Sequence, residues 1–197
     1  MSADRPVEEP LDQPGPLPPI EVLDQISAGI FAATMAPLFE GAPRFLGRLA
    51  NARPFGSLEA LFERARAIAN AMPAAEQLEL IDAHPRLGAP PASVSALSFE
   101  EQGYGHEAAE QAARDAVDER RRVAAELDRL NVAYEDRFGF RYCVFVAGRS
   151  RAELIPGMAA ALDAERSDEI VRALDEVIDI ARDRAGRLAP PRRGGSA

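Results

Sequence analysis

The sequence contains no lysine and no tryptophan, and only one cysteine and two histidines among its 197 residues. Without lysine, Schiff-base catalysis by a lysine amine is excluded. The single cysteine, Cys143, excludes an intramolecular disulfide and any metal site built from several cysteines. No apolar run approaches the ~18 residues that a membrane-spanning helix needs. The sequence therefore predicts no transmembrane segment.

Positive charge is also scarce, because 23 arginines face 32 aspartates and glutamates, for a formal net charge of −9. Nucleic acids and anionic membranes bind basic surfaces, so neither is expected as a partner. The N-terminus is acidic and rich in proline, unlike a signal peptide, and the C-terminus carries no peroxisomal or retention signal. We therefore expect a cytoplasmic protein.

Hydrophobic residues make up 47% of the chain, with alanine and leucine abundant and β-branched or aromatic runs few. This composition favours helices over strands. We predict an all-α fold, a compact single-domain bundle of about seven to nine helices over residues 20–188. The Pro-rich residues 1–19 and the polar residues 189–197 are predicted to be disordered tails.

Local signals bound several of the predicted helices. Pro43 can open one helix, and Ser57 is a good N-cap for the next. Residues 106–136 form a long predicted helix with an apolar stripe. Ser150 and Glu153 form a capping-box pattern, and Ser167 is predicted to cap the last helix.

His84 ends a predicted helix, because the following Pro85 disfavours further helical backbone. Histidine exchanges a proton near neutral pH, so a rigidly held histidine suits acid/base chemistry. The alternative is a partly buried structural histidine that is bonded to a backbone carbonyl. Sequence position alone does not separate the two interpretations.

Ser98 and Glu101 open the predicted helix that follows a Pro-rich loop. Their spacing is that of a capping box, as at Ser150 and Glu153, and this is the purely structural interpretation. In the functional interpretation, Glu101 and the Gln102 amide lie beside an anionic ligand at the N-terminus of this helix.

Arg184 lies on the apolar stripe of the last predicted helix. Its guanidinium either extends outward to solvent or bonds a buried carboxylate, and a bidentate grip on a substrate carboxylate or imide is the sharper hypothesis. Asn131 and Tyr134 are interpreted as a polar brace for the loop after their helix. Cys143 is interpreted as a small buried hydrophobe, and His106 as a surface residue.

Taken together, these residues resemble the 2-oxo-4-hydroxy-4-carboxy-5-ureidoimidazoline (OHCU) decarboxylase family, which acts at the last step of urate degradation to allantoin. The resemblance spans about residues 20–188 and rests on three segments: Arg53-Pro54-Phe55 with His84-Pro85-x-Leu87-Gly88; Ser98-x-x-Glu101-Gln102; and Leu130-Asn131-x-x-Tyr134-x-x-Arg137-Phe138-Gly139-Phe140.

The resemblance implies an all-α bundle, commonly a homodimer, with no metal and no organic cofactor. It places catalysis on His84 and Glu101. It places substrate contacts, largely through backbone groups, on Pro85, Ser98, Gln102, Tyr142, Cys143, Val144, Phe145, Val146 and Arg184. The expected reaction is loss of CO2 from OHCU to give (S)-allantoin. His84 is expected to transfer the proton, while Glu101 orients His84 or takes the substrate's hydroxyl proton.

The sequence departs from the family pattern at four points. Arg86 replaces an acidic residue, Arg141 replaces a proline, the run after Gln102 is shortened to Gly103-Tyr104-Gly105, and the interval from His84 to Glu101 is short. Two alternatives follow. The chain acts on another small ureido or hydroxy acid, or it is a non-catalytic helical binding module.

Overall fold

The computed structural model describes residues 15–89, 94–101 and 114–189, and it confirms an all-α fold. The described residues contain helices and loops but no β-strand. The elements along the chain are α1 (Ile20–Leu23), α2 (Ala28–Met35), the 3-10 helix η1 (Ala36–Phe39), α3 (Pro43–Asn51), α4 (Leu58–Ala71), α5 (Ala74–Asp82), α6 (Ala96–Glu101), α8 (Arg114–Phe138), α9 (Arg151–Ala161) and α10 (Arg166–Leu188).

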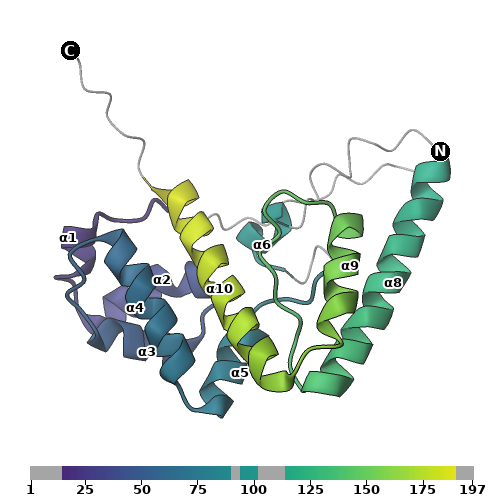
Figure 1. The fold of residues 1–197 in the computed structure, drawn as a ribbon. Helices are drawn as coiled ribbons and strands as arrows, with labels where there is room; N and C mark the ends of the chain where they lie inside the picture. The colour runs from purple at the N-terminus through teal and green to yellow at the C-terminus, as the bar shows by residue number, and fades with distance from the viewer. Residues whose placement is uncertain (1–14, 90–93, 102–113, 190–197) are drawn as a thin grey trace.

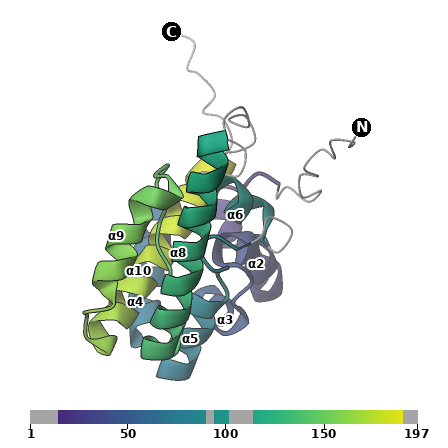
Figure 2. The same cartoon turned by 90° about the vertical axis from the view of Figure 1, so that its right-hand side faces the viewer.

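The last long helix, α10, lies in the middle of the molecule, with α1 to α5 on one side and α8 and α9 on the other (Figure 1). It contacts α4, α5 and η1, while α8 contacts α9. In the perpendicular view, α8 and α9 run side by side along the face turned toward the viewer (Figure 2). No helix in the described part of the chain combines the length and the apolarity that crossing a membrane requires.

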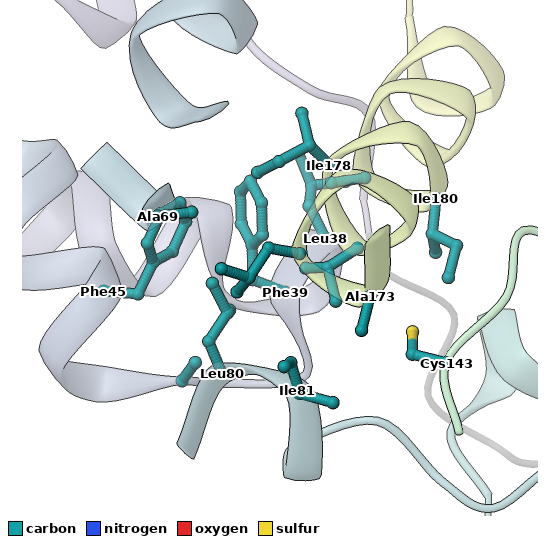
Figure 3. Close-up of a cluster of buried hydrophobic side chains, with 14 of the residues drawn as sticks. Leu38, Phe39, Phe45, Ala69, Leu80, Ile81, Cys143, Ala173, Ile178 and Ile180 are labelled. Carbon is teal, nitrogen blue, oxygen red and sulfur yellow. The ribbon is translucent and has the colours of Figure 1, made fainter. Parts of the chain in front are cut away.

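The sequence of α10 explains its central place, because apolar side chains cover more than one of its faces. Ile178 and Ile180 point to opposite sides of the helix (Figure 3). The first packs among the N-terminal helices, and the second lies beside Cys143. Complete burial of such a side chain contributes about 1.5–3 kcal/mol, so both sides of α10 are held by core packing.

Most helix boundaries follow the local signals in the sequence. Pro43 occupies the first turn of α3, and the Ser57 hydroxyl accepts a hydrogen bond from the Ala60 N–H at 3.0 Å. Ser150 and Glu153 form the predicted capping box at the start of α9. These three predictions are confirmed.

Two predicted helix starts are wrong. Helix α6 begins at Ala96, two residues before Ser98, because the Ser95 hydroxyl accepts from the Ser98 N–H and takes the capping role. Helix α10 begins at Arg166, after Glu165, so Ser167 lies inside the helix. The long helix α8 runs to Phe138, and residues 106–113 of its predicted range lie outside the described residues.

The chain turns sharply after η1. Glu40 has φ 48° and ψ 31°, in the left-handed region, and Gly41 follows with φ 78°. Glycine adopts this conformation freely, but a residue with a side chain is strained there by about 1–3 kcal/mol. A glutamate at this position is therefore a feature to explain.

Candidate active site

A cavity of about 360 Å³ lies where four segments meet: the end of α5, helix α6, the strip after α8, and the last turns of α10. The residues that line it are His84, Pro85, Leu87, Ser98, Glu101, Tyr142 to Arg149, Ile180, Asp183, Arg184 and Arg187. Every residue that the sequence analysis assigned to the site is among them except Gln102, which lies outside the described residues.

His84 is buried, with 4% of its surface exposed. Its Nδ1 lies 3.3 Å from the Leu80 carbonyl oxygen, one turn back along the chain. A carbonyl only accepts hydrogen bonds, so the proton of the neutral ring sits on Nδ1 and the lone pair on Nε2. Nε2 is buried and has no hydrogen-bond partner in the described part of the chain. His84 therefore presents a basic nitrogen that the protein leaves available.

The charge state of His84 follows from its surroundings. Burial and, to a lesser extent, the nearby positive charge of Arg184 lower the pKa of its imidazole from 6.5 to about 4, although the negative charge of Glu40 and the contact with the Leu80 carbonyl act in the opposite direction. Burial disfavours a charged imidazolium because it removes the charge from water. His84 is consequently neutral at physiological pH, which is the form that can accept a proton.

Two side chains from distant segments hold the backbone around His84. Arg141 donates from Nη1 to the carbonyl oxygens of Asp82, at 2.8 Å, and of His84, at 3.1 Å. Asn131 donates from Nδ2 to the Leu87 carbonyl oxygen at 3.0 Å. Asn131 thus braces the loop after His84 and not, as its place in the sequence suggested, the loop after its own helix.

Tyr134 contacts a different part of the protein from Asn131. Its hydroxyl donates to Glu169 Oε1 at 3.1 Å, so it does not share the brace formed by Asn131. The interpretation of Asn131 and Tyr134 as one structural unit is therefore wrong, because the two side chains face different neighbours.

The capping-box interpretation of Ser98 and Glu101 is also wrong. The Ser98 hydroxyl donates to Glu40 Oε1 at 2.7 Å and accepts from Arg184 Nη2 at 3.0 Å. Glu101 accepts from Arg184 and from Arg187 Nη2, the latter at 2.9 Å. Both residues face inward to the cavity and its arginines and do not close the end of their helix.

Arg184 does not reach solvent, since its side chain is only 1% exposed. Its guanidinium donates from Nε and Nη2 to Glu101 at 2.8 and 2.9 Å, and from Nη2 to Glu40 at 2.8 Å. Nη1 donates to the carbonyl oxygens of Pro37, at 3.0 Å, and Leu38, at 3.4 Å. Of the interpretations of Arg184, extension to solvent is wrong and bonding to a buried carboxylate is confirmed, and the bidentate partner in this structure is Glu101 of the protein itself.

The hypothesis that Glu101 orients His84 does not describe this arrangement. The ring is held by Leu80, while the hydrogen bonds of Glu101 among the described residues go to arginines. The reason is geometric: Arg184 offers two parallel N–H groups, which match a carboxylate better than a single imidazole does.

Glu40 is the residue of this cluster that the sequence analysis missed. Burial alone would raise the pKa of its carboxyl, but the positive charge of Arg184 and the Ser98 hydroxyl outweigh that effect and hold the pKa below its usual 4.5. The sequence does contain a feature that points to this residue, because Glu40 is the only charged residue between Gln25 and Pro43. A lone carboxylate in so apolar a stretch needs a buried partner.

The strip from Tyr142 to Val146 runs along α10 without forming a strand. The Phe145 N–H donates to Glu176 Oε2 at 2.6 Å, and the Cys143 carbonyl accepts from Arg172 Nη1 at 2.9 Å. Burial raises the pKa of the Cys143 thiol to about 12, so the side chain is a neutral hydrophobe, as predicted. Side chains of α10 therefore fix the strip against the cavity.

The sequence was compared with those of known protein families. A profile of the OHCU decarboxylase family matches residues 24–186. The uric acid degradation bifunctional protein PucL of Bacillus subtilis is 32% identical over 160 residues, which is 81% of this chain and 30% of that protein. The chain thus spans under a third of the bifunctional relative.

Shorter relatives match along nearly their whole length. The 2-oxo-4-hydroxy-4-carboxy-5-ureidoimidazoline decarboxylase of Halalkalicoccus jeotgali is 31% identical over 179 residues, covering 89% of this chain and 94% of that protein.

Two solved structures have the same fold. An OHCU decarboxylase crystallised in the presence of (S)-allantoin has a TM-score of 0.58 at 25% identity, over 78% of this chain and 94% of that one. An (S)-allantoin synthase has a TM-score of 0.60 at 19% identity, over 87% of this chain and 54% of that one, and supports the fold alone.

Proposed function

The chain belongs to the OHCU decarboxylase family, and from this premise we propose that it removes CO2 from OHCU and forms (S)-allantoin in urate degradation. The observation that carries the proposal is the buried, neutral His84, whose Nε2 is available at a cavity that Glu101 and Arg184 also line. The cavity volume of about 360 Å³ suits a compact polar heterocycle.

The substrate carries a carboxylate and a hydroxyl on one ring carbon, next to a carbon–nitrogen double bond. When the bond to the carboxylate breaks, CO2 leaves and the electron pair passes toward that nitrogen, which takes a proton from solvent. The substrate itself therefore accepts the electrons.

His84 moves the second proton in the proposed mechanism. Its Nε2 accepts the hydroxyl proton and returns it to the neighbouring ring carbon as the hydroxyl becomes a carbonyl. Because the ring is held by Leu80, delivery comes from one side of the substrate and sets the stereochemistry. A well-placed acid/base group contributes typically ~10²–10⁴-fold to the rate.

Glu101 is assigned to accept a hydrogen bond from the substrate hydroxyl or ureido group, with its carboxylate fixed by Arg184 and Arg187. Pro85, Ser98, Gln102 and the backbone of residues 142–146 are assigned to the ring and ureido groups. Arg184 acts through Glu101 and does not grip the substrate, since protein acceptors already surround its guanidinium.

The family resemblance also supports a cytoplasmic homodimer. Light scattering after size-exclusion chromatography tests the dimer, because it measures the mass of the assembly independently of its shape. A monomeric mass would contradict that part of the proposal without affecting the assignment of the reaction.

The deciding experiment is a stereospecific assay with freshly prepared OHCU, followed by circular dichroism of the product. The wild-type protein is expected to produce dextrorotatory allantoin faster than the spontaneous reaction. Racemic product at the spontaneous rate, together with stabilisation of the protein by allantoin, would instead indicate a non-catalytic binding module. Absence of both would leave a decarboxylase of another small acid as the next candidate.

A further inference from the structure

We propose that Glu40, which does not line the cavity, is a positioning residue that holds Arg184 and Ser98 and through them the carboxylate of Glu101. The proposal rests on the proposed function, because Glu101 is a member of the site assigned above. It assigns a role to a residue that lies 61 positions before Glu101 in the sequence.

The contacts of Glu40 carry the argument. A single oxygen, Oε1, accepts from Ser98 Oγ at 2.7 Å, from Arg184 Nη2 at 2.8 Å and from Ser95 Oγ at 2.9 Å. The side chain is 12% exposed. A carboxylate that collects three donors in a mostly buried place is strongly directional, since charge-assisted hydrogen bonds are the short and strong ones.

The same guanidinium nitrogen, Nη2 of Arg184, also donates to Glu101 Oε2 at 2.9 Å. Glu40 and Glu101 therefore hold one arginine from two directions. If the Glu40 carboxylate were lost, Arg184 and Ser98 would both lose an acceptor. The angle at which Arg184 meets Glu101 would then depend on the weaker, uncharged contacts of Arg184 with Ser98 and with the carbonyl oxygens of Pro37 and Leu38.

The backbone supports a specific role for this side chain. Glu40 adopts a left-handed conformation that glycine would adopt without strain, and Gly41 follows it. Strained backbone is retained where the surrounding contacts determine it, which is typical of functional sites. Here those contacts are the three hydrogen bonds of the carboxylate.

Glu40 also contributes to the charge around His84. Its negative charge favours the protonated ring and so opposes the lowering of the His84 pKa by burial and by Arg184. The other charged or titratable groups that share the cavity or the cluster with His84 are Glu101, Tyr142, Cys143, Arg149, Asp183, Arg184 and Arg187. Removing the Glu40 charge alone should therefore lower the pKa of His84.

Two variants separate the effect of the Glu40 charge from the effect of its side chain on the position of Arg184 and Glu101. Glu40→Gln keeps an acceptor oxygen and removes the charge, while Glu40→Gly removes the whole side chain and relieves the backbone. Misplacement of a catalytic group by ~1 Å can reduce turnover ~10²-fold. We expect kcat to fall about 10-fold in E40Q and ~10²-fold in E40G, with little change in KM. The matched control is Glu126→Gln, which removes an arginine-paired glutamate on α8.

Melting temperature and the NMR titration of His84 are measured on the same proteins. Only two histidines are present, so His106→Gln identifies the His84 signal. Support requires a lower kcat in folded protein and a His84 pKa below that of wild type, with E126Q unchanged. A wild-type kcat in both E40Q and E40G overturns the proposal. It is also overturned if the variants lose activity only at temperatures where the melting curve shows that they are unfolded. If the wild type itself does not act on OHCU, the titration decides, and an unchanged His84 pKa in E40Q overturns it.

Discussion

Arg184 donates to both carboxylate oxygens of Glu101, from Nε at 2.8 Å and from Nη2 at 2.9 Å, and the two side chains are 1% and 12% exposed. A buried bidentate pair of this kind adds little net stability compared with apolar residues of the same shape, but breaking it from one side is costly. Its value therefore lies in fixing the direction of the Glu101 carboxylate toward the cavity.

Replacing Arg184 tests how much the fold depends on it. Arg184→Met leaves Glu40 and Glu101 without their shared partner and is expected to lower the free energy of unfolding by about 3–5 kcal/mol. Arg129→Met breaks an exposed pair with Glu126 and is expected to cost about 0–1 kcal/mol. Urea unfolding curves of the two variants give the comparison, and similar costs for both would show that the buried cluster is not held as described.

Glu101→Gln separates stability from catalysis. The amide oxygen still accepts from Arg184, so the expected loss is that of a charged hydrogen bond, about 1.5–3 kcal/mol in the free energy of unfolding. Formation of (S)-allantoin is expected to fall ~10²-fold or more, because a charged acceptor at the substrate is lost. Measuring turnover at a temperature where the variant is fully folded isolates the second effect, and near-normal turnover there would remove Glu101 from the mechanism.

The local pattern of the sequence was sufficient for the fold but not for the site. Helical periodicity and capping residues predict α3, α4 and α9, since these signals involve neighbours in the chain. The start of α6 was missed because Ser95 and Ser98 offer competing caps. Local reasoning singled out His84, Ser98, Glu101 and Arg184 as candidates but left their roles open, and the family resemblance supplied the roles and added the strip 142–146.

Glu40 shows why the other contacts of the site could not be predicted from the sequence. Its partners Ser98 and Arg184 lie 58 and 144 positions away, so their contact depends on how α6 and α10 pack and not on any local pattern. The same holds for Arg141, which reaches back 57 residues to the His84 carbonyl. The available signals were a single charge in an apolar stretch, Glu40, and a charge on the apolar face of a helix, Arg184, and they become informative only as a pair.

The lowered pKa of His84 predicts a pH dependence of stability. In the folded protein the pKa is about 4, against 6.5 for an unperturbed histidine, so between these values the unfolded chain binds more protons. The contribution of neutral His84 to the free energy of unfolding is therefore complete above pH 6.5. It is lost as the pH falls toward 4, by about 3 kcal/mol in total. Glu40, whose pKa is also lowered, adds a further loss below pH 4.5.

His84→Gln is expected to flatten this dependence between pH 6.5 and 4, and His106→Gln serves as the control for the other histidine. Urea unfolding at pH 7.5, 6 and 5 gives the slope for each protein. A slope in H84Q equal to that of wild type would mean that His84 is not neutral and buried in the folded chain.

The contact between Glu176 and the Phe145 N–H leads to a prediction about ligand binding. Glu176 holds the strip that we assign to the substrate, and a neutral acceptor forms a weaker hydrogen bond than a carboxylate does. Glu176→Gln is therefore expected to weaken binding of (S)-allantoin by roughly 5- to 10-fold, about 1–1.4 kcal/mol, with a smaller change in kcat. Asp179→Asn is the control, because Asp179 lies on the same helix but pairs with Arg66. Isothermal titration calorimetry measures the affinity of each variant and of the wild type for allantoin. If E176Q binds allantoin as tightly as the wild type does, the strip does not depend on Glu176 to bind its ligand.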